Sequence, residues 1–155
     1  MIFRQLFDSV SSTYSYILAS RKGGEALIID PVLEKVDRYI QLFDELDVKL
    51  VKAIDTHLHA DHITGLGALR DRTLCVTVMG EQTKADVVSM RVRDGDPLNS
   101  EGLQLGVIYT PGHTEDSSSF TFQDRVFTGD TLLIRGTGRT DFQNGDARVQ
   151  YESIF

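Results

Sequence analysis

The chain has 155 residues, a length typical of one domain, and its 41% hydrophobic and 25% charged residues are ordinary for a globular protein. The net charge of −7 excludes a basic surface for nucleic acid or anionic lipid, and no apolar run approaches the roughly 18 residues of a membrane span. The single cysteine allows no internal disulfide, and the N-terminus lacks the pattern of a targeting peptide, so we expect a cytoplasmic protein that binds neither nucleic acid nor a membrane.

The first half of the chain is predicted to alternate strands with helices. Alternating apolar residues predict strands at 2–7, 13–20 and 26–29. Asp30 and Pro31 then form an expected helix cap and first helical residue, followed by apolar residues at helical spacing to Phe43. We expect a strand at 50–55, a helix over 61–69 and a strand at 74–79, in which Cys75 is a small buried residue.

The second half is predicted to consist mainly of strands. A turn is expected at 94–96, a strand at 103–110 and a hairpin of 118–122 with 125–127. An amphipathic helix follows over 146–155. This pattern predicts an α/β fold in one domain, residues 1–155.

Histidines gather in one short stretch, Thr56–Gly65, which contains His57, His59, Asp61 and His62. The remaining histidine, His113, follows the expected strand 103–110, and Asp130 follows the expected hairpin, so every candidate lies where a strand ends. In an extended segment, positions 57, 59 and 61 point to one side. Imidazoles and carboxylates at such a point suit borderline metals such as zinc and iron.

Two kinds of metal site are compatible with these residues. His57, His113 and Asp130 alone would form the two-histidine, one-carboxylate face of non-haem iron(II) oxygenases. All six side chains, with Asp130 bridging, would instead suit two metal ions that generate a hydroxide for hydrolysis. The spacing does not choose between the two.

The motif His57-Leu58-His59-Ala60-Asp61-His62 resembles the HxHxDH signature of the metallo-β-lactamase superfamily. The superfamily's downstream histidine and aspartate correspond to His113 and Asp130. The resemblance covers nearly the whole chain and implies a four-layer αββα sandwich with the metal site at one edge of its two sheets. Within the superfamily, Thr56–Gly65 and Leu132–Phe142 resemble the persulfide dioxygenase branch, which is related to glyoxalase II.

The resemblance to that branch implies one Fe²⁺ per chain, bound by His57, His113 and Asp130. It implies oxidation of glutathione persulfide by O₂ to sulfite and glutathione, and it leaves His59, Asp61 and His62 as supporting residues or a second metal site. Zinc could replace iron at these ligands. Arg139 and Arg135 are close enough in sequence to Asp130 to bind glutathione carboxylates, although pairing with Asp141 is the alternative.

The chain departs from the family pattern in two places. Thr114-Glu115-Asp116-Ser117 stands where many relatives carry Pro-Gly, and relatives of this branch continue past the helix expected at 146–155 with further strands, helices and a His-Asp-Tyr segment. We therefore expect a domain that lacks its C-terminal portion and exposes apolar surface, which would favour association such as a homodimer. The sequence does not decide whether a partner sulfurtransferase supplies the persulfide substrate.

Two further functions are compatible with the sequence. A dizinc thioester hydrolase of the glyoxalase II kind, a hydroxyacylglutathione hydrolase, would need two metal ions with Asp61 and His62 as ligands. A non-catalytic metal-binding or persulfide-sensing module would bind metal and turn nothing over. The segment Leu132–Phe142 favours the dioxygenase over both.

Overall fold

The computed structural model describes all residues 1–155 and contains two β-sheets. The first sheet has six strands in the order β1-β2-β3-β4-β5-β6, and the second has four in the order β10-β9-β8-β7. The strands of the first sheet are β1 (Ile2–Asp8), β2 (Thr13–Ala19), β3 (Glu25–Ile29), β4 (Lys49–Ile54), β5 (Val76–Gly80) and β6 (Met90–Val92). Those of the second are β7 (Pro97–Ser100), β8 (Leu103–Tyr109), β9 (Ser118–Phe122) and β10 (Arg125–Phe127).

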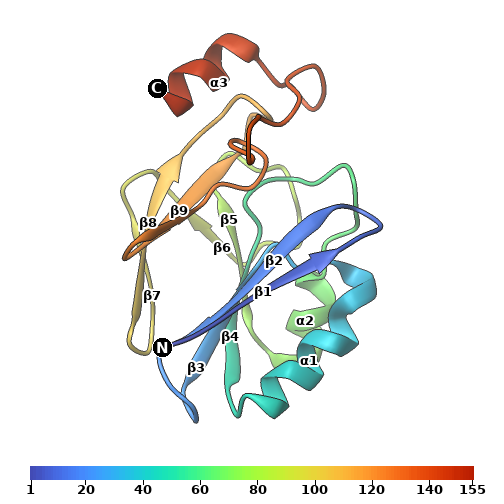
Figure 1. The fold of residues 1–155 in the computed structure, drawn as a ribbon, viewed down its shortest axis with the longest axis vertical. Helices are drawn as coiled ribbons and strands as arrows, with labels where there is room; N and C mark the ends of the chain where they lie inside the picture. The colour runs from blue at the N-terminus through green and yellow to red at the C-terminus, as the bar shows by residue number, and fades with distance from the viewer.

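The order of antiparallel and parallel pairs explains where the helices lie. β1, β2 and β3 pair antiparallel, whereas β3, β4, β5 and β6 pair parallel, and parallel neighbours need a crossover. Helix α1 (Val36–Glu45), preceded by a 3₁₀ turn at Leu33–Lys35, connects β3 to β4, and α2 (Leu66–Thr73) connects β4 to β5. Both helices cover the same face of the first sheet (Figure 1). The carboxyl ends of β3, β4 and β5 therefore meet at one edge.

The apolar residues divide between two layers of core. One cluster lies between the sheets and draws on both, with Leu27 and Ile54 from the first sheet and Leu105 and Phe120 from the second. The other lies between the first sheet and the helices α1 and α2. The prediction of an α/β fold with two packed sheets is confirmed.

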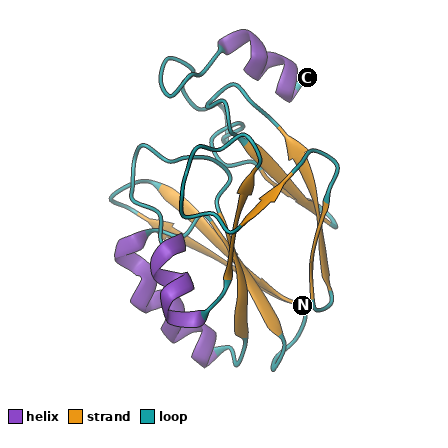
Figure 2. Ribbon diagram, turned by 180° about the vertical axis from the view of Figure 1, so that it is seen from behind, coloured by secondary structure: helices purple, strands orange, loops and turns teal.

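Three of the four expected layers are formed by these residues. Helix α3 (Ala147–Ile154) lies beyond the ends of β8 and β9 and does not cover the outer face of the second sheet (Figures 1 and 2). This leaves Ile108 and Val126 of that sheet exposed. The chain therefore has the order helices, sheet, sheet, with α3 placed at the end that carries the histidine loops.

Two helix starts differ from the prediction. Asp30 is not a helix cap: its backbone is left-handed at φ 54° and its carboxylate binds the chain after β4, while α1 begins at Val36. The helix expected over 61–69 begins only at Leu66, because backbone hydrogen bonds from Leu33 N to Ile63 O and from Gly65 N to Pro31 O hold the preceding loop against the 31–33 segment. The short strands β6 and β7 were also missed.

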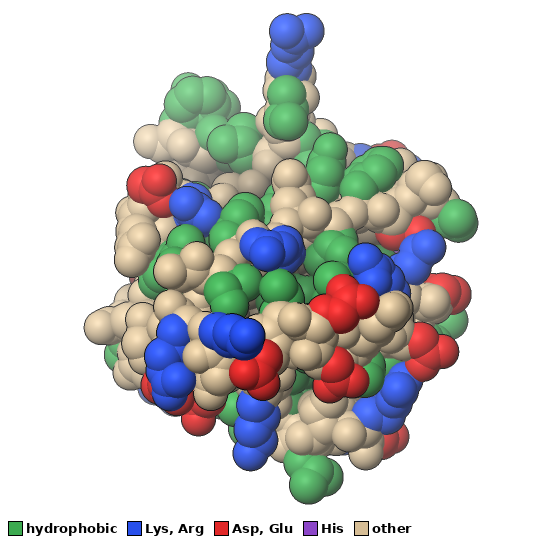
Figure 3. All heavy atoms as spheres, turned by 60° about the horizontal axis from the view of Figure 1, so that its bottom comes forward, with side chains coloured by type: hydrophobic (Ala, Val, Ile, Leu, Met, Phe, Trp, Pro, Cys, Tyr) green, Lys and Arg blue, Asp and Glu red, His purple; other side chains and the backbone are tan.

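The end of the molecule away from the histidine loops carries mixed charge. Figure 3 shows Lys and Arg side chains interspersed with Asp and Glu among apolar groups, and no histidine on this face. No helix has both the length and the apolar character that crossing a bilayer requires. Cys75 is buried and free, as expected.

Candidate metal centre

The four histidines come together although one of them is 51 residues from its nearest companion in the chain. The His57 and His59 ring centres are 4.1 Å apart, His59 and His62 are 4.2 Å apart, and His57 and His113 are 4.8 Å apart. The loop after β4 supplies three of these rings and the loop after β8 supplies the fourth. The structure therefore brings together the four histidines that the sequence marked as candidate metal ligands.

The candidate ligand atoms fall into two adjoining groups. His57, His113 and Asp130 each offer one atom within 4.8 Å of the others, and so do His59, Asp61 and His62. In the first group, Asp130 Oδ2 lies 3.4 Å from His113 Nε2 and 3.9 Å from His57 Nε2. The structure thus gathers the three candidates for a single-metal site and places the other three in a separate group beside them, while the bridging role of Asp130 stays a prediction.

Hydrogen bonds set the tautomers of the two histidines in the first group. The Thr56 hydroxyl donates to the Asp30 carboxylate, at 2.9 Å, so it accepts the Nδ1 proton of His57, also at 2.9 Å. His113 donates its Nδ1 proton to the Arg139 carbonyl oxygen at 2.7 Å. Both Nε2 atoms are left as acceptors that face the Asp130 carboxylate.

His57 Nε2, His113 Nε2 and the Asp130 carboxylate all present lone pairs, and no proton lies between them. A divalent cation requires such a set of deprotonated ligand atoms. Burial lowers the pKa of His57 well below its ordinary value, which keeps the ring neutral, and burial also raises the pKa of Asp130. A cation at this point would compensate the desolvated carboxylate. The residues present therefore fit a metal ion held by His57, His113 and Asp130.

The second group is organised around Asp30. His59 Nε2 donates to Asp30 Oδ1 at 3.1 Å, which leaves His59 Nδ1 facing Asp61. Burial alone would lower the pKa of His59, but the Asp30 carboxylate raises it to about 9. His62 Nδ1 contacts the Thr13 hydroxyl at 3.1 Å, and His62 Nε2 is buried without any partner. That unpaired nitrogen is available to bind a second metal ion.

Three supporting residues were not predicted from the sequence. Asp30 and Thr13 act as just described, and Asp116, 4% exposed, accepts hydrogen bonds from the Leu58 backbone at 3.1 Å and from the Thr114 hydroxyl at 2.6 Å. Asp116 thereby joins the two histidine loops. The sequence position of Asp30 could have indicated its role. Asp30 directly follows the buried strand β3, and the end of β3 lies beside the end of β4 because the two strands pair parallel.

The two arginines considered for substrate binding are both exposed. The Arg139 guanidinium pairs with the Asp141 carboxylate, with 2.7 Å from Nε to Oδ1, and lies over the Phe142 ring. Arg135 has a left-handed backbone, at φ 62°, in the same loop. Their contact with a substrate stays a prediction.

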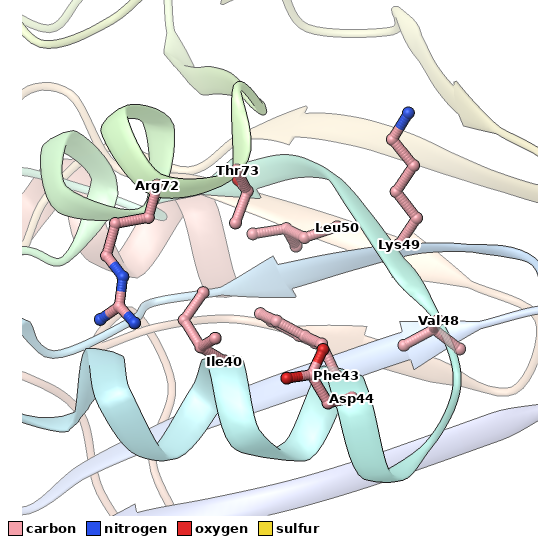
Figure 4. Close-up of a pocket in the computed structure, with 8 residues that line it drawn as sticks. All are labelled: Ile40, Phe43, Asp44, Val48, Lys49, Leu50, Arg72 and Thr73. Carbon is pink, nitrogen blue, oxygen red and sulfur yellow. The ribbon is translucent and has the colours of Figure 1, made fainter.

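A cavity of about 690 Å³ opens beside the two groups of ligands. Its lining residues include Phe7 and Tyr14 from the β1–β2 hairpin as well as the candidate ligands His59 and Asp130. A second hollow of about 330 Å³, between α1, α2 and β4, holds Asp44, Lys49 and Arg72 over an apolar floor and contains no metal ligand (Figure 4). The larger cavity is therefore the candidate substrate site.

A fold of two packed sheets with the HxHxDH residues, His113 and Asp130 at one edge defines a class of metalloprotein. The family model described as the metallo-beta-lactamase superfamily matches residues 8–86 and 78–154. The chain belongs to the metallo-β-lactamase superfamily.

Particular relatives narrow the comparison. The chain is 43% identical over 157 residues to the human protein named persulfide dioxygenase ETHE1, mitochondrial, covering 99% of this chain and 61% of that one. The crystal structure of ETHE1 from Myxococcus xanthus is 53% identical, with a TM-score of 0.96, and the match covers 99% of this chain and 68% of the other. A hydroxyacylglutathione hydrolase of Haemophilus ducreyi is 32% identical, covering 90% of this chain and 58% of the relative. The chain thus spans about three fifths of the length of these curated relatives.

Proposed function

We propose that this protein is an iron-dependent persulfide dioxygenase. It would convert glutathione persulfide, O₂ and water to glutathione and sulfite. The observation that carries the proposal is the convergence of His57 Nε2, His113 Nε2 and an Asp130 oxygen with no proton donor between them. Relatives named persulfide dioxygenase at 43% identity support the choice of reaction.

Two imidazoles and one carboxylate on one face of a metal are the ligand set of non-haem iron(II) oxygenases. A bound Fe²⁺ would supply open positions for the persulfide sulfur and for O₂. The protein's own contribution is to hold the three ligands in place before substrate arrives. Thr56 and the Arg139 carbonyl orient the rings of His57 and His113, and Asp116 joins the two loops that carry them.

The rest of the substrate would occupy the cavity beside the metal ligands. The lining includes the rings of Phe7 and Tyr14, which would shield one side of the reacting sulfur from water when substrate is bound. Arg139 would bind a glutathione carboxylate in place of Asp141, because a guanidinium pairs bidentately with either. A cytoplasmic location, a homodimer and a sulfurtransferase partner stay predictions.

A second function is favoured by one specific observation. His59, Asp61 and His62 form a second group of candidate ligand atoms, and His62 Nε2 is buried without a partner. A dizinc thioester hydrolase would use both groups, with a metal-activated water as nucleophile. The relative named hydroxyacylglutathione hydrolase supports this alternative at the lower identity of 32%.

The deciding experiment measures oxygen uptake and sulfite together. Protein loaded with iron under anaerobic conditions receives glutathione persulfide and O₂, and a parallel sample loaded with zinc receives a glutathione thioester. Uptake with equimolar sulfite, lost together with bound iron in His113→Ala, is the expected result. Thioester hydrolysis without oxygen uptake, by protein with two metals per chain, would replace the dioxygenase with the hydrolase.

A further inference from the structure

One dipeptide, Gly138–Arg139, contacts two of the three candidate iron ligands. The Gly138 N–H donates to the Asp130 carbonyl oxygen at 2.7 Å, and the Arg139 carbonyl oxygen accepts the Nδ1 proton of His113, also at 2.7 Å. The position of this dipeptide therefore sets the orientation of the His113 ring relative to Asp130. Any residue that fixes the dipeptide acts on the metal site without touching it.

Helix α3 packs directly on the loop that carries His113. Asp146 caps the helix by accepting from Arg148 N and Val149 N, and its own N–H donates to the Gly112 carbonyl oxygen at 2.8 Å. The approach is so close that a Cβ at Gly112 would lie 2.3 Å from Gln150 Cα. The Ser153 hydroxyl donates to the Pro111 carbonyl oxygen at 2.6 Å.

Gln150 is the one buried residue of this helix. Its side chain is 3% exposed, and Nε2 donates to the Gly138 carbonyl oxygen at 3.0 Å. Its Oε1 atom has no partner. The amide cannot be reversed, because Oε1 would then face another acceptor at Gly138. A leucine would fill similar space without burying an unpaired oxygen, so what distinguishes glutamine here is the bond to Gly138.

We propose that Gln150 is a positioning residue for the metal ligand His113. It holds the Gly138 carbonyl, the Gly138–Arg139 dipeptide stays in place, and the Arg139 carbonyl keeps the proton of His113 on Nδ1. This leaves His113 Nε2 free to bind metal. The inference rests on the metal site of the proposed function but not on the reaction, so it holds equally if the protein is a hydrolase.

A purely structural role for Gln150 would have different consequences. If the residue only docks α3, removing another anchor of the same helix should disturb the site equally. Ser153 provides that comparison, since its bond to Pro111 anchors α3 to the same loop without contacting Gly138. The variants Gln150→Leu and Ser153→Ala therefore form a matched pair.

The experiment reads the His113 ring itself. Long-range ¹H–¹⁵N NMR spectra of the metal-free protein report which ring nitrogen carries the proton, and zinc titrations against a competing chelator, followed at the same resonances, give the affinity at His113. In Gln150→Leu we expect an increased share of the Nε2-protonated ring and zinc binding weakened by about tenfold. In Ser153→Ala we expect the wild-type tautomer and an affinity within about twofold of wild type.

Two results would overturn the proposal. One is a wild-type tautomer and zinc affinity in Gln150→Leu, and the other is an equal loss in Ser153→Ala. If Gln150→Leu does not fold, Gln150→Met, which keeps an unbranched side chain without a donor, takes its place. Because zinc affinity and tautomer are measured without turnover, failure of the dioxygenase assay would leave this test intact.

Discussion

Gly138 is a position at which a single added methyl group should disrupt the candidate metal centre. A Cβ there would lie 2.4 Å from the Asp130 carbonyl oxygen and 2.6 Å from His113 Nδ1, whereas ordinary contacts begin at 3.4 Å. Gly138→Ala must therefore move the loop or the ring by about 1 Å, several times the roughly 0.2 Å tolerance of metal–ligand distances. We expect the metal-dependent rate to fall about 100-fold, or about 2.7 kcal/mol in activation free energy.

Gly136→Ala is the matched control in the same loop. A Cβ at Gly136 meets nothing within 4 Å, and Gly136 does not have a positive φ. Both variants would be compared by metal content after dialysis, by zinc affinity and by turnover, with circular dichroism to verify folding. Wild-type metal affinity and turnover in folded Gly138→Ala would refute the argument that this close approach positions His113 and Asp130.

Four further predictions concern the side chains of Asp116, Arg139 and Cys75. Asp116→Ala removes the carboxylate that joins the two histidine loops and should weaken metal binding about tenfold. The change Glu115→Gln at the half-buried neighbouring residue should leave metal affinity unchanged. Equal affinities of the two variants in chelator competition would contradict this prediction. Arg139→Ala keeps the backbone carbonyl that accepts the His113 proton, so metal content should be unchanged. The KM for glutathione persulfide should rise about tenfold. An unchanged KM would show that the Arg139 side chain does not bind the substrate. Burial raises the pKa of the Cys75 thiol above its ordinary 9.0, so alkylation at pH 8 should be much slower in native protein than in urea. Since the unfolded thiol ionises first as pH rises, the folded state should also lose stability above about pH 9, and Cys75→Ala should reduce that loss, as measured by urea unfolding.

The candidate ligands could be predicted from the sequence because their chemistry is local. Three histidines and an aspartate within six positions, each candidate at the end of an apolar run, indicate a metal site whatever the fold around them. Strands were also predictable, since alternation of apolar residues is a local property: β2, β3, β8 and β9 lie within about a residue of their expected bounds. The family resemblance then supplied the order of the layers.

Helix starts were less predictable because long-range contacts override local preference. Asp30 before Pro31 is a good local cap, yet its carboxylate instead binds Thr56 and His59. The 61–65 segment could begin a helix, but bonds to the 31–33 segment and the contacts of His62 hold it in an irregular loop. In both places the backbone conformation positions candidate metal ligands, and functional sites are where local sequence rules are expected to fail.

What the sequence by itself determined is the set of atoms that can bind a metal. What only the tertiary structure decided is how those atoms are oriented. The tautomer of His57 depends on the Thr56 hydroxyl, which Asp30 orients. The tautomer of His113 depends on the Arg139 carbonyl, which lies 26 residues further along the chain. Gln150 holds that carbonyl in place through its bond to Gly138. Such hydrogen bonds join segments that only the packing of two sheets and α3 brings together, so no pattern of neighbouring residues encodes them.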